Sequence, residues 1–342
     1  MARQVAVPLE LEEEAKIQRP PLGRRLLNLA RQHPLGLFGL VTVAILFFAA
    51  IFADLIVPYD PQAIDREALL AGPSSSHLLG TDRLGRDVLS RTIFGARISL
   101  FIGLVSVVFG VTIGSFLGVV SGYLGRLVDS VIQRSVDILL AFPAIVLVLA
   151  VVTEIGDEDS AVRVFLADNT PVPEDSFLGI PFFLDIFIIS LAIAVAVVAG
   201  VTRIVRGAVL SLKENVYVEA ARALGASDGR IMLHHIFPNV VALVVILASI
   251  TLPIAIIAEA AISFLGVGVP GPTPSWGADL TGPNRATAQT GAWWPVFFPG
   301  LALSLVVLGF NMLGDAFRDI SDPRLRGSLG SGSGGGSGTG GI

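Results

Sequence analysis

Six apolar stretches, each about long enough to cross a lipid bilayer, restrict this sequence more than any other feature. A hydrocarbon core about 30 Å thick is crossed by roughly 20 apolar residues in an α-helix. Only 15% of the 342 residues are charged and 53% are hydrophobic, whereas a soluble domain carries about 25% charged residues. The sequence therefore predicts an all-α polytopic membrane protein with six transmembrane helices. The expected spans are residues 35–57, 98–122, about 131–152, about 183–202, about 240–265 and about 296–313.

The distribution of Lys and Arg predicts the orientation of these spans. Basic residues gather before the first stretch, after the fourth stretch and in the C-terminal tail, while residues 156–181 are mainly acidic. Lys and Arg accumulate in short cytoplasmic loops, so both termini are expected in the cytoplasm. The loop 59–97 carries five Arg and five acidic residues, and it is long enough to be less bound by this rule. The first stretch lacks a small-residue cleavage site and is expected to be retained.

Several chemistries are excluded by what the sequence lacks. There is no Cys, which removes disulfides and thiolate metal sites. The net charge of −5 offers no basic surface for nucleic acid. Neither Lys16 nor Lys213 follows a Gly, so the phosphate-binding loop of an ATPase is missing and no catalytic residue is expected. The four His are too scattered for a metal cluster: His33, His77, His234 and His235.

A stripe of small residues runs along the second stretch at every fourth position. Such a stripe forms one face of a helix and lets membrane helices approach closely. Two interpretations remain open: tight packing inside one subunit, or a face that slides against a partner around the pathway. The helix-packing residues are Gly110, Gly114, Gly118 and Gly122.

Two carboxylates lie within the expected spans, Asp137 in the third and Glu259 in the fifth. An ionisable group in the membrane costs several kcal/mol unless it faces a cavity or a partner. Each is a possible pathway residue, although each lies close enough to the membrane surface to be hydrated. If both carried protons, the chain would be a secondary proton-coupled transporter, which is the alternative function; an intramembrane enzyme is a further one.

The segment of about residues 213–239 predicts a compact helical hairpin at the cytoplasmic surface. A short helix is expected through Leu224, with a stop at Gly225, because Gly permits the left-handed turn that ends many helices. A second helix is expected to begin at Ser227 or Asp228 and to end at Pro238.

The residues Glu219, Ala220, Ala221, Gly225 and Pro238, at their spacing, resemble the EAA loop of binding-protein-dependent ABC importer permeases. His235 and Phe237 depart from the residues that the family often has there. Three further segments are similar to the C-type subunit of the dipeptide, oligopeptide and nickel permeases, and the resemblance covers residues 35–326. These segments are residues 77–87, residues 264–277 and residues 311–326.

The resemblance implies a type I ABC importer transmembrane fold and a coupling role for those five EAA-loop residues. It implies a B-type permease partner, two ABC ATPase subunits that carry ATP and magnesium, and an extracytoplasmic substrate-binding protein. The expected location is the cytoplasmic (inner) membrane of a prokaryote, and the expected substrates are di- or oligopeptides.

The same comparison divides the chain into four regions. They are a cytoplasmic segment 1–34, a first helix with its extracytoplasmic loop 35–96, a transmembrane core 97–318, and a tail 319–342 that is Gly/Ser-rich and flexible from about residue 327.

Overall fold

The computed structural model describes residues 34–157, 159–169, 176–177, 180–181, 183–288 and 291–321. Almost all of the predicted N-terminal segment, the Gly/Ser-rich tail and part of the acidic loop 156–181 lie outside the described residues. The regular structure of the described part is helical, as predicted, apart from a two-residue antiparallel ladder of β1 (Ser176–Phe177) with β2 (Ile180–Pro181) and an isolated bridge between Thr81 and Asp87.

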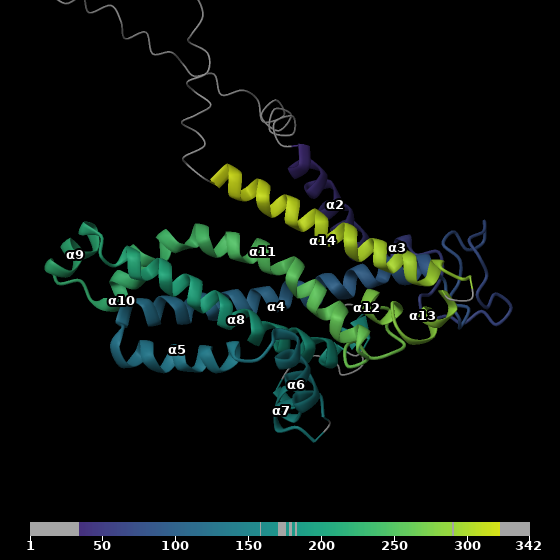
Figure 1. The fold of residues 1–342 in the computed structure, drawn as a ribbon, viewed down its shortest axis with the longest axis horizontal. Coiled ribbons are helices and arrows are strands. Elements are labelled where there is room, and N and C mark those ends of the chain that lie inside the picture. The colour runs from purple at the N-terminus through teal and green to yellow at the C-terminus, as the bar shows by residue number, and fades with distance from the viewer. Residues whose placement is uncertain are drawn as a thin grey trace, which may run out of the picture.

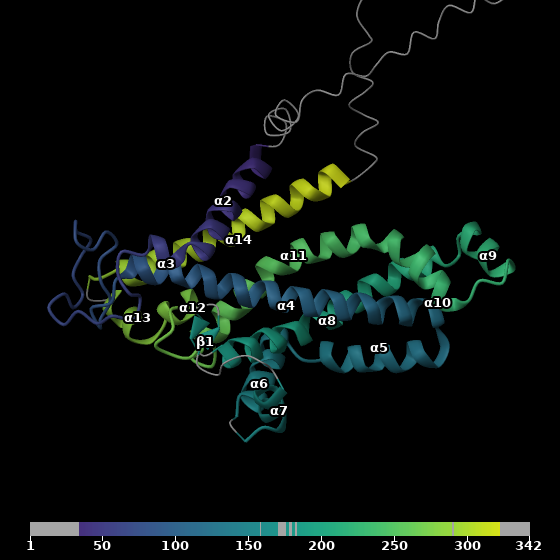
Figure 2. The same cartoon turned by 180° about the vertical axis from the view of Figure 1, so that it is seen from behind.

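The helices follow one another in an up-and-down arrangement (Figures 1 and 2). Their bounds are α2 Pro34–Ile51, α3 Ala53–Ile56, α4 Val88–Leu124, α5 Arg126–Leu140, α6 Ala144–Gly156, α7 Ala161–Asn169, α8 Phe183–Leu212, α9 Val216–Ala223, α10 Asp228–Ile231, a π-helix Met232–Ile236, α11 Phe237–Phe264, α12 Trp276–Asp279, α13 Gly282–Ala288 and α14 Trp294–Ser321.

Five helical runs in the described part of the chain are long and apolar enough to cross a membrane: α2, α4, α8, the continuous run Asp228–Phe264, and α14. They correspond to five of the six predicted spans. Two of these helices are longer than their predicted spans. The helix α4 extends beyond residues 98–122 at both ends, and α8 extends beyond residues 183–202 at its C-terminal end.

The third predicted span, residues 131–152, is broken into two helices, which together are long and apolar enough to form the sixth span. The structure divides it into α5 and α6, whose axes are bent by 94°. The break falls at residues 141–143, where Pro143 precedes the first residue of α6. Proline has no N–H to donate and its ring clashes with the preceding turn, so α5 ends at Leu140. Figure 1 shows α5 lying along α8, while α6 and α7 project from the bundle.

The packing of α4 on α8 forms the centre of the bundle. A Cβ atom at Gly110, Gly114, Gly118 or Gly122 would lie 2.7, 2.8, 2.8 or 2.9 Å from the Cβ of a valine on α8. The four valines are themselves four residues apart: Val197, Val201, Val205 and Val209. The glycine stripe is therefore the face that α4 turns toward α8 inside this subunit, where no side chain separates the α4 backbone from α8.

The helices α2 and α14 form a second close pair (Figure 2). A Cβ atom at Gly39 would lie 2.6 Å from the carbonyl oxygen of Gly309. A Cβ atom at Gly309 would in turn lie 2.8 Å from the Cβ of Thr42. Because neither position tolerates a side chain, the first and last described helices are held together by direct backbone contact.

Candidate functional site

The predicted hairpin lies at one end of the molecule and consists of α9 and α10 (Figure 1). Its first helix turns Val218 into the core, where that side chain is fully buried. On the other side Val216 is 80% exposed and Leu224 is 88% exposed. Glu219 and Ala220 are also exposed, and Ala221 is half-buried. The hairpin thus presents an apolar surface that this subunit does not cover.

Gly225 forms the turn of the hairpin, as predicted. Its φ is +83°, a conformation that glycine adopts at little cost. The N–H of Gly225 donates to the carbonyl of Arg222 at 3.0 Å, and the N–H of Ala226 donates to the carbonyl of Ala221 at 3.1 Å. This pair of hydrogen bonds is the Schellman arrangement that ends a helix, so the angle between α9 and α10 is set at Gly225.

Pro238 does not end the second helix, so that prediction is wrong. The chain continues from α10 through the π-helix Met232–Ile236 into α11, and Pro238 lies in the first turn of α11. A π-helix forms i→i+5 hydrogen bonds instead of the i→i+4 bonds of an α-helix. Pro238 follows this change of bonding pattern, so its lack of an N–H does not remove a regular α-helical hydrogen bond. The hairpin is therefore continuous with a membrane span.

Sequence reasoning missed Tyr123, which joins the hairpin to α4. The Tyr123 hydroxyl donates to Oδ1 of Asp228 at 2.9 Å and accepts from Nη2 of Arg222 at 3.4 Å. The hydrogen bond to Tyr123 raises the pKa of the Arg222 guanidinium above its ordinary value. The ammonium of Lys213 donates to the carbonyl of Gly122 at 3.2 Å. One signal was available in the sequence: Tyr is rare in this chain, with 3 residues, and one lies at the end of the second apolar stretch.

The two predicted pathway carboxylates lie in different environments and the structure does not bring them together. Asp137 on α5 is exposed and forms an ion pair with Arg203 of α8. Glu259 on α11 is fully buried and accepts hydrogen bonds from three serine hydroxyls, of Ser99 at 2.9 Å, Ser263 at 2.9 Å and Ser275 at 2.7 Å. Glu259 therefore links α4, α11 and the segment before α12.

The segment 77–87, one of the three that carried the family resemblance, folds at the end of the molecule opposite the hairpin. Asp87 accepts from the N–H and the hydroxyl of Ser90 at 2.8 Å each, and it therefore caps the N-terminus of α4. Nδ1 of His77 lies 3.0 Å from the other oxygen of Asp87. Asp82 accepts from Nε of Arg86 at 2.7 Å. The motif residues thus order the loop and fix the start of α4.

The second motif segment packs against the start of α4, which directly follows the first segment, although the two are far apart in the sequence. Nη2 of Arg91 donates to Oδ1 of Asp279 at 2.6 Å, and both side chains are buried. The indole N–H of Trp276 donates to the carbonyl of Thr92 at 2.9 Å. A Cβ atom at Gly277 would lie 2.3 Å from the carbonyl oxygen of Ala260. This end of α4 is therefore locked to α11 and α12.

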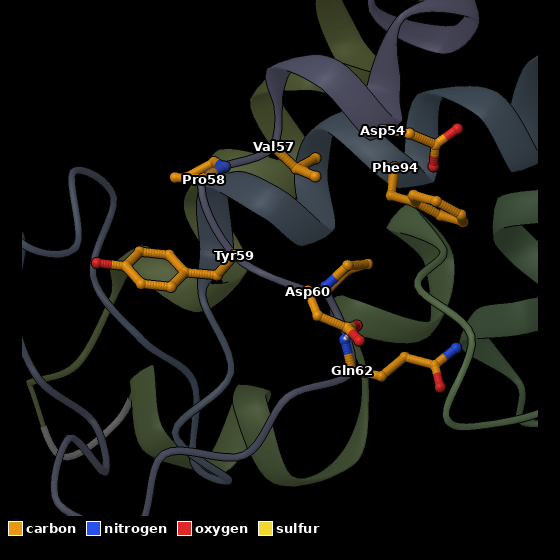
Figure 3. A pocket seen from close by; sticks show the side chains of 8 residues that line it. Asp54, Val57, Pro58, Tyr59, Asp60, Gln62 and Phe94 are labelled. Atoms are coloured by element: carbon orange, nitrogen blue, oxygen red, sulfur yellow. Dashed lines mark hydrogen bonds between the residues drawn. The ribbon is translucent and has the colours of Figure 1, made fainter.

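A cavity of about 510 Å³ opens beside this loop (Figure 3). Asp54 in its wall accepts from Nη2 of Arg97 at 2.8 Å. Its lining residues are Asp54, Val57, Pro58, Tyr59, Asp60, Pro61, Gln62 and Phe94. Within the described ranges, no three His, Cys, Asp or Glu side chains form a group that could hold a metal ion.

Two family models match the chain. "Binding-protein-dependent transport system inner membrane component" matches residues 110–327, which is more than half of the chain. "N-terminal TM domain of oligopeptide transport permease C" matches residues 24–73.

Curated relatives match along most of their length. The chain is 42% identical over 294 residues to the dipeptide transport system permease protein DppC of Escherichia coli (strain K12), covering 84% of this chain and 88% of the relative. It is 36% identical over 296 residues to DppC of Alkalihalophilus pseudofirmus, covering 86% and 88%. It is 39% identical over 301 residues to the glutathione transport system permease protein GsiD of Pectobacterium atrosepticum, covering 86% and 89%. The chain belongs to the family of binding-protein-dependent transport system inner membrane components.

Proposed function

We propose that this chain is a membrane permease subunit of an ATP-driven, binding-protein-dependent importer that moves di- or oligopeptides into the cytoplasm by alternating access. The observation that carries the proposal is the hairpin of α9 and α10, whose turn at Gly225 and exposed apolar residues suit docking into a groove of another subunit. The names of the relatives support peptides as the substrate class, since they refer to dipeptide and glutathione transport.

The proposed partners follow from what one permease subunit cannot do alone. Its sequence has no phosphate-binding loop, so ATP and magnesium are proposed to bind to two partner ATPase subunits. A B-type permease subunit would supply the other half of the pathway, and an extracytoplasmic binding protein would deliver the peptide. Glu219, Ala220, Ala221, Gly225 and Pro238 are the proposed coupling residues.

The exposed apolar residues of the hairpin suit burial against a partner protein. Val216 and Leu224 are 80% and 88% exposed, and burying a Val or Leu side chain stabilises an interface by about 1.5–3 kcal/mol. Seating in a protein groove would remove both from water.

The proposed orientation puts this end and both termini in the cytoplasm, because Lys and Arg follow α8 and precede α2.

The alternative of a secondary proton-coupled transporter is contradicted by membership of the binding-protein-dependent family. The geometry agrees, because Asp137 is exposed and ion-paired with Arg203, whereas Glu259 is held by serine hydroxyls at a distance from it. That either residue lines the peptide pathway stays a prediction.

Uptake by the assembled transporter tests the proposed function. The chain is co-expressed with a B-type subunit and two ATPase subunits, purified, and placed in proteoliposomes with the binding protein outside. Uptake of a labelled dipeptide is expected to require ATP at the ATPases and to be unaffected by an imposed proton gradient. Uptake driven by the proton gradient without ATP would overturn the proposal.

A further inference from the structure

We propose that the hydroxyl of Tyr123 is the joint through which movement of the hairpin reaches α4, with Arg222 and Asp228 as its positioning partners. The inference rests on the proposed coupling role of the hairpin, and it names a contact inside this chain. It also gives a role to Tyr123, the aromatic residue next to the C-terminal end of α4.

One oxygen atom links both legs of the hairpin to the same point on α4. Arg222 belongs to α9 and Asp228 belongs to α10, on either side of Gly225. The Tyr123 hydroxyl accepts from the first at 3.4 Å and donates to the second at 2.9 Å. Because each leg is bonded to this hydroxyl, the two legs cannot turn about Gly225 without stretching one of the bonds. The hairpin and the end of α4 are therefore expected to move together.

The ring of Tyr123 packs in the hydrophobic core, while its hydroxyl forms the polar contact between α4 and the hairpin. The Tyr123 side chain is only 7% exposed and is part of the hydrophobic core. The guanidinium carbon of Arg222 lies 5.9 Å from the centre of the ring, over its face. Lys213 adds a second tie, since its ammonium donates to the carbonyl of Gly122 at 3.2 Å. Removing the hydroxyl alone would leave the ring packing and the Lys213 contact in place.

The helix α4 is built to carry such a movement across the molecule. It has 37 residues, and at 1.5 Å per residue it is about 55 Å long. Its glycine face is in direct contact with α8 along about three turns, which stiffens the pair. At the far end Asp87 caps α4 and Arg91 is paired with Asp279 of α12. A displacement at Tyr123 therefore acts on the loop and helices around α12.

The test compares ATP hydrolysis with peptide uptake in the purified, fully assembled transporter in proteoliposomes. Four variants are measured: Tyr123→Phe, Asp228→Ala, the double variant, and Tyr59→Phe as the matched control. The control also loses a tyrosine hydroxyl, one that donates to the carbonyl of Ser76 at 2.7 Å at the opposite end of the chain. Both rates are normalised to the amount of assembled complex, so a lower yield of any variant does not affect the ratio.

Tyr123→Phe is expected to keep ATP hydrolysis within about twofold of the unmodified complex while uptake per ATP falls about tenfold or more, as for loss of a hydrogen bond to a charged group. Asp228→Ala is expected to produce a similar fall, and the double variant no further fall, because residues that act through one contact are not additive. Tyr59→Phe should keep the normal ratio. A normal ratio in Tyr123→Phe, or losses that add in the double variant, would overturn the joint.

A second measurement separates this inference from the proposed function. Amide hydrogen exchange of residues 216–231 in the assembled complex should be faster in Tyr123→Phe than in the unmodified complex, and unchanged in Tyr59→Phe. If the unmodified complex hydrolyses ATP without taking up peptide, the proposed substrate or function fails, while hydrogen exchange still reports on the joint. Unchanged exchange of the hairpin in Tyr123→Phe would overturn the joint whatever the substrate.

Discussion

At the scale of single residues, two glycines are required for different physical reasons. Gly114 is helical and a Cβ there would lie 2.8 Å from the Cβ of Val201, so its requirement is one of space. Gly225 has no heavy atom within 4 Å of a Cβ position but has a φ of +83°, so its requirement is one of backbone conformation. Substitutions at Gly114 should therefore disturb helix packing, whereas substitutions at Gly225 should disturb the turn of the hairpin.

Gly114→Ala is expected to destabilise the subunit by about 1–3 kcal/mol, because an added carbon overpacks the contact of α4 with α8. Gly207→Ala on α8 is the matched control, since no heavy atom lies within 4 Å of a Cβ at that position. The control should be neutral or more stable by up to about 1 kcal/mol, the helix propensity difference between Gly and Ala. Thermal unfolding in detergent measures both, and equal unfolding temperatures for the two variants would contradict the packing argument.

Gly225→Val is expected to distort the hairpin without preventing membrane insertion, because a branched residue at this φ costs roughly 1–2 kcal/mol. Membrane abundance should remain normal, while ATP-driven uptake of labelled peptide should fall. Ala221→Trp should have the same result by filling the half-buried side of α9 and preventing it from seating in a partner. Full uptake by both variants would show that the hairpin does not couple ATP hydrolysis to transport.

At the scale of elements, the ends of α4 are held by polar contacts and its middle by packing. One end is joined to α12 through Arg91 and Asp279, which are 188 residues apart in the sequence. The other end is joined to α5 and α8 through Asp129, which accepts from Nε and Nη2 of Arg206 at 2.6 Å each and from the hydroxyl of Ser121 at 2.5 Å. Loss of one such contact should loosen one end of α4 and leave the other in place.

Arg91→Ala is expected to cost about 3–5 kcal/mol of stability, because it leaves the Asp279 carboxylate buried without its ion-pair partner. The double variant Arg91→Met, Asp279→Leu should recover most of that loss, since an apolar pair of similar volume removes the unpaired charge. Unfolding in detergent would be followed for the single variants Arg91→Ala and Asp279→Leu and for the double variant. A double variant less stable than either single variant would contradict this account of the contact.

At the scale of the whole molecule, the two ends are predicted to lie on opposite sides of the membrane. One end consists of the loop 57–87 with α12 and α13, and the other consists of α9 and α10 (Figure 1). The chain has no Cys, so a single introduced thiol reports the side of the membrane on which it lies. The charge distribution predicts that the hairpin is cytoplasmic and the loop extracytoplasmic.

Glu67→Cys and Glu214→Cys test this orientation, because both positions are exposed and lie at opposite ends of the molecule. An impermeant thiol reagent added to spheroplasts should label position 67 and spare position 214. After the membrane is permeabilised, both positions should react, which serves as the control for access. Labelling of position 214 in intact spheroplasts would reverse the proposed topology.

The two prolines show where local sequence reasoning ends. Pro143 divides a predicted span, whereas Pro238 was expected to end a helix and is instead included in one. The same residue type has opposite outcomes because the cost of its missing N–H depends on what the neighbouring turns can do. At Pro238 a π turn precedes the proline; at Pro143 the chain turns by 94° between α5 and α6.

The sequence by itself determined the helical class, the position of most spans, the hairpin turn at Gly225 and the family. These features depend on local properties: a helix in lipid satisfies its own backbone hydrogen bonds, and a glycine permits its own turn. Only the tertiary structure decided that the glycine stripe meets four valines of α8, that Arg91 meets Asp279, and that Tyr123 joins α4 to the hairpin. Those contacts connect residues far apart in the chain, and they form only when the whole bundle packs.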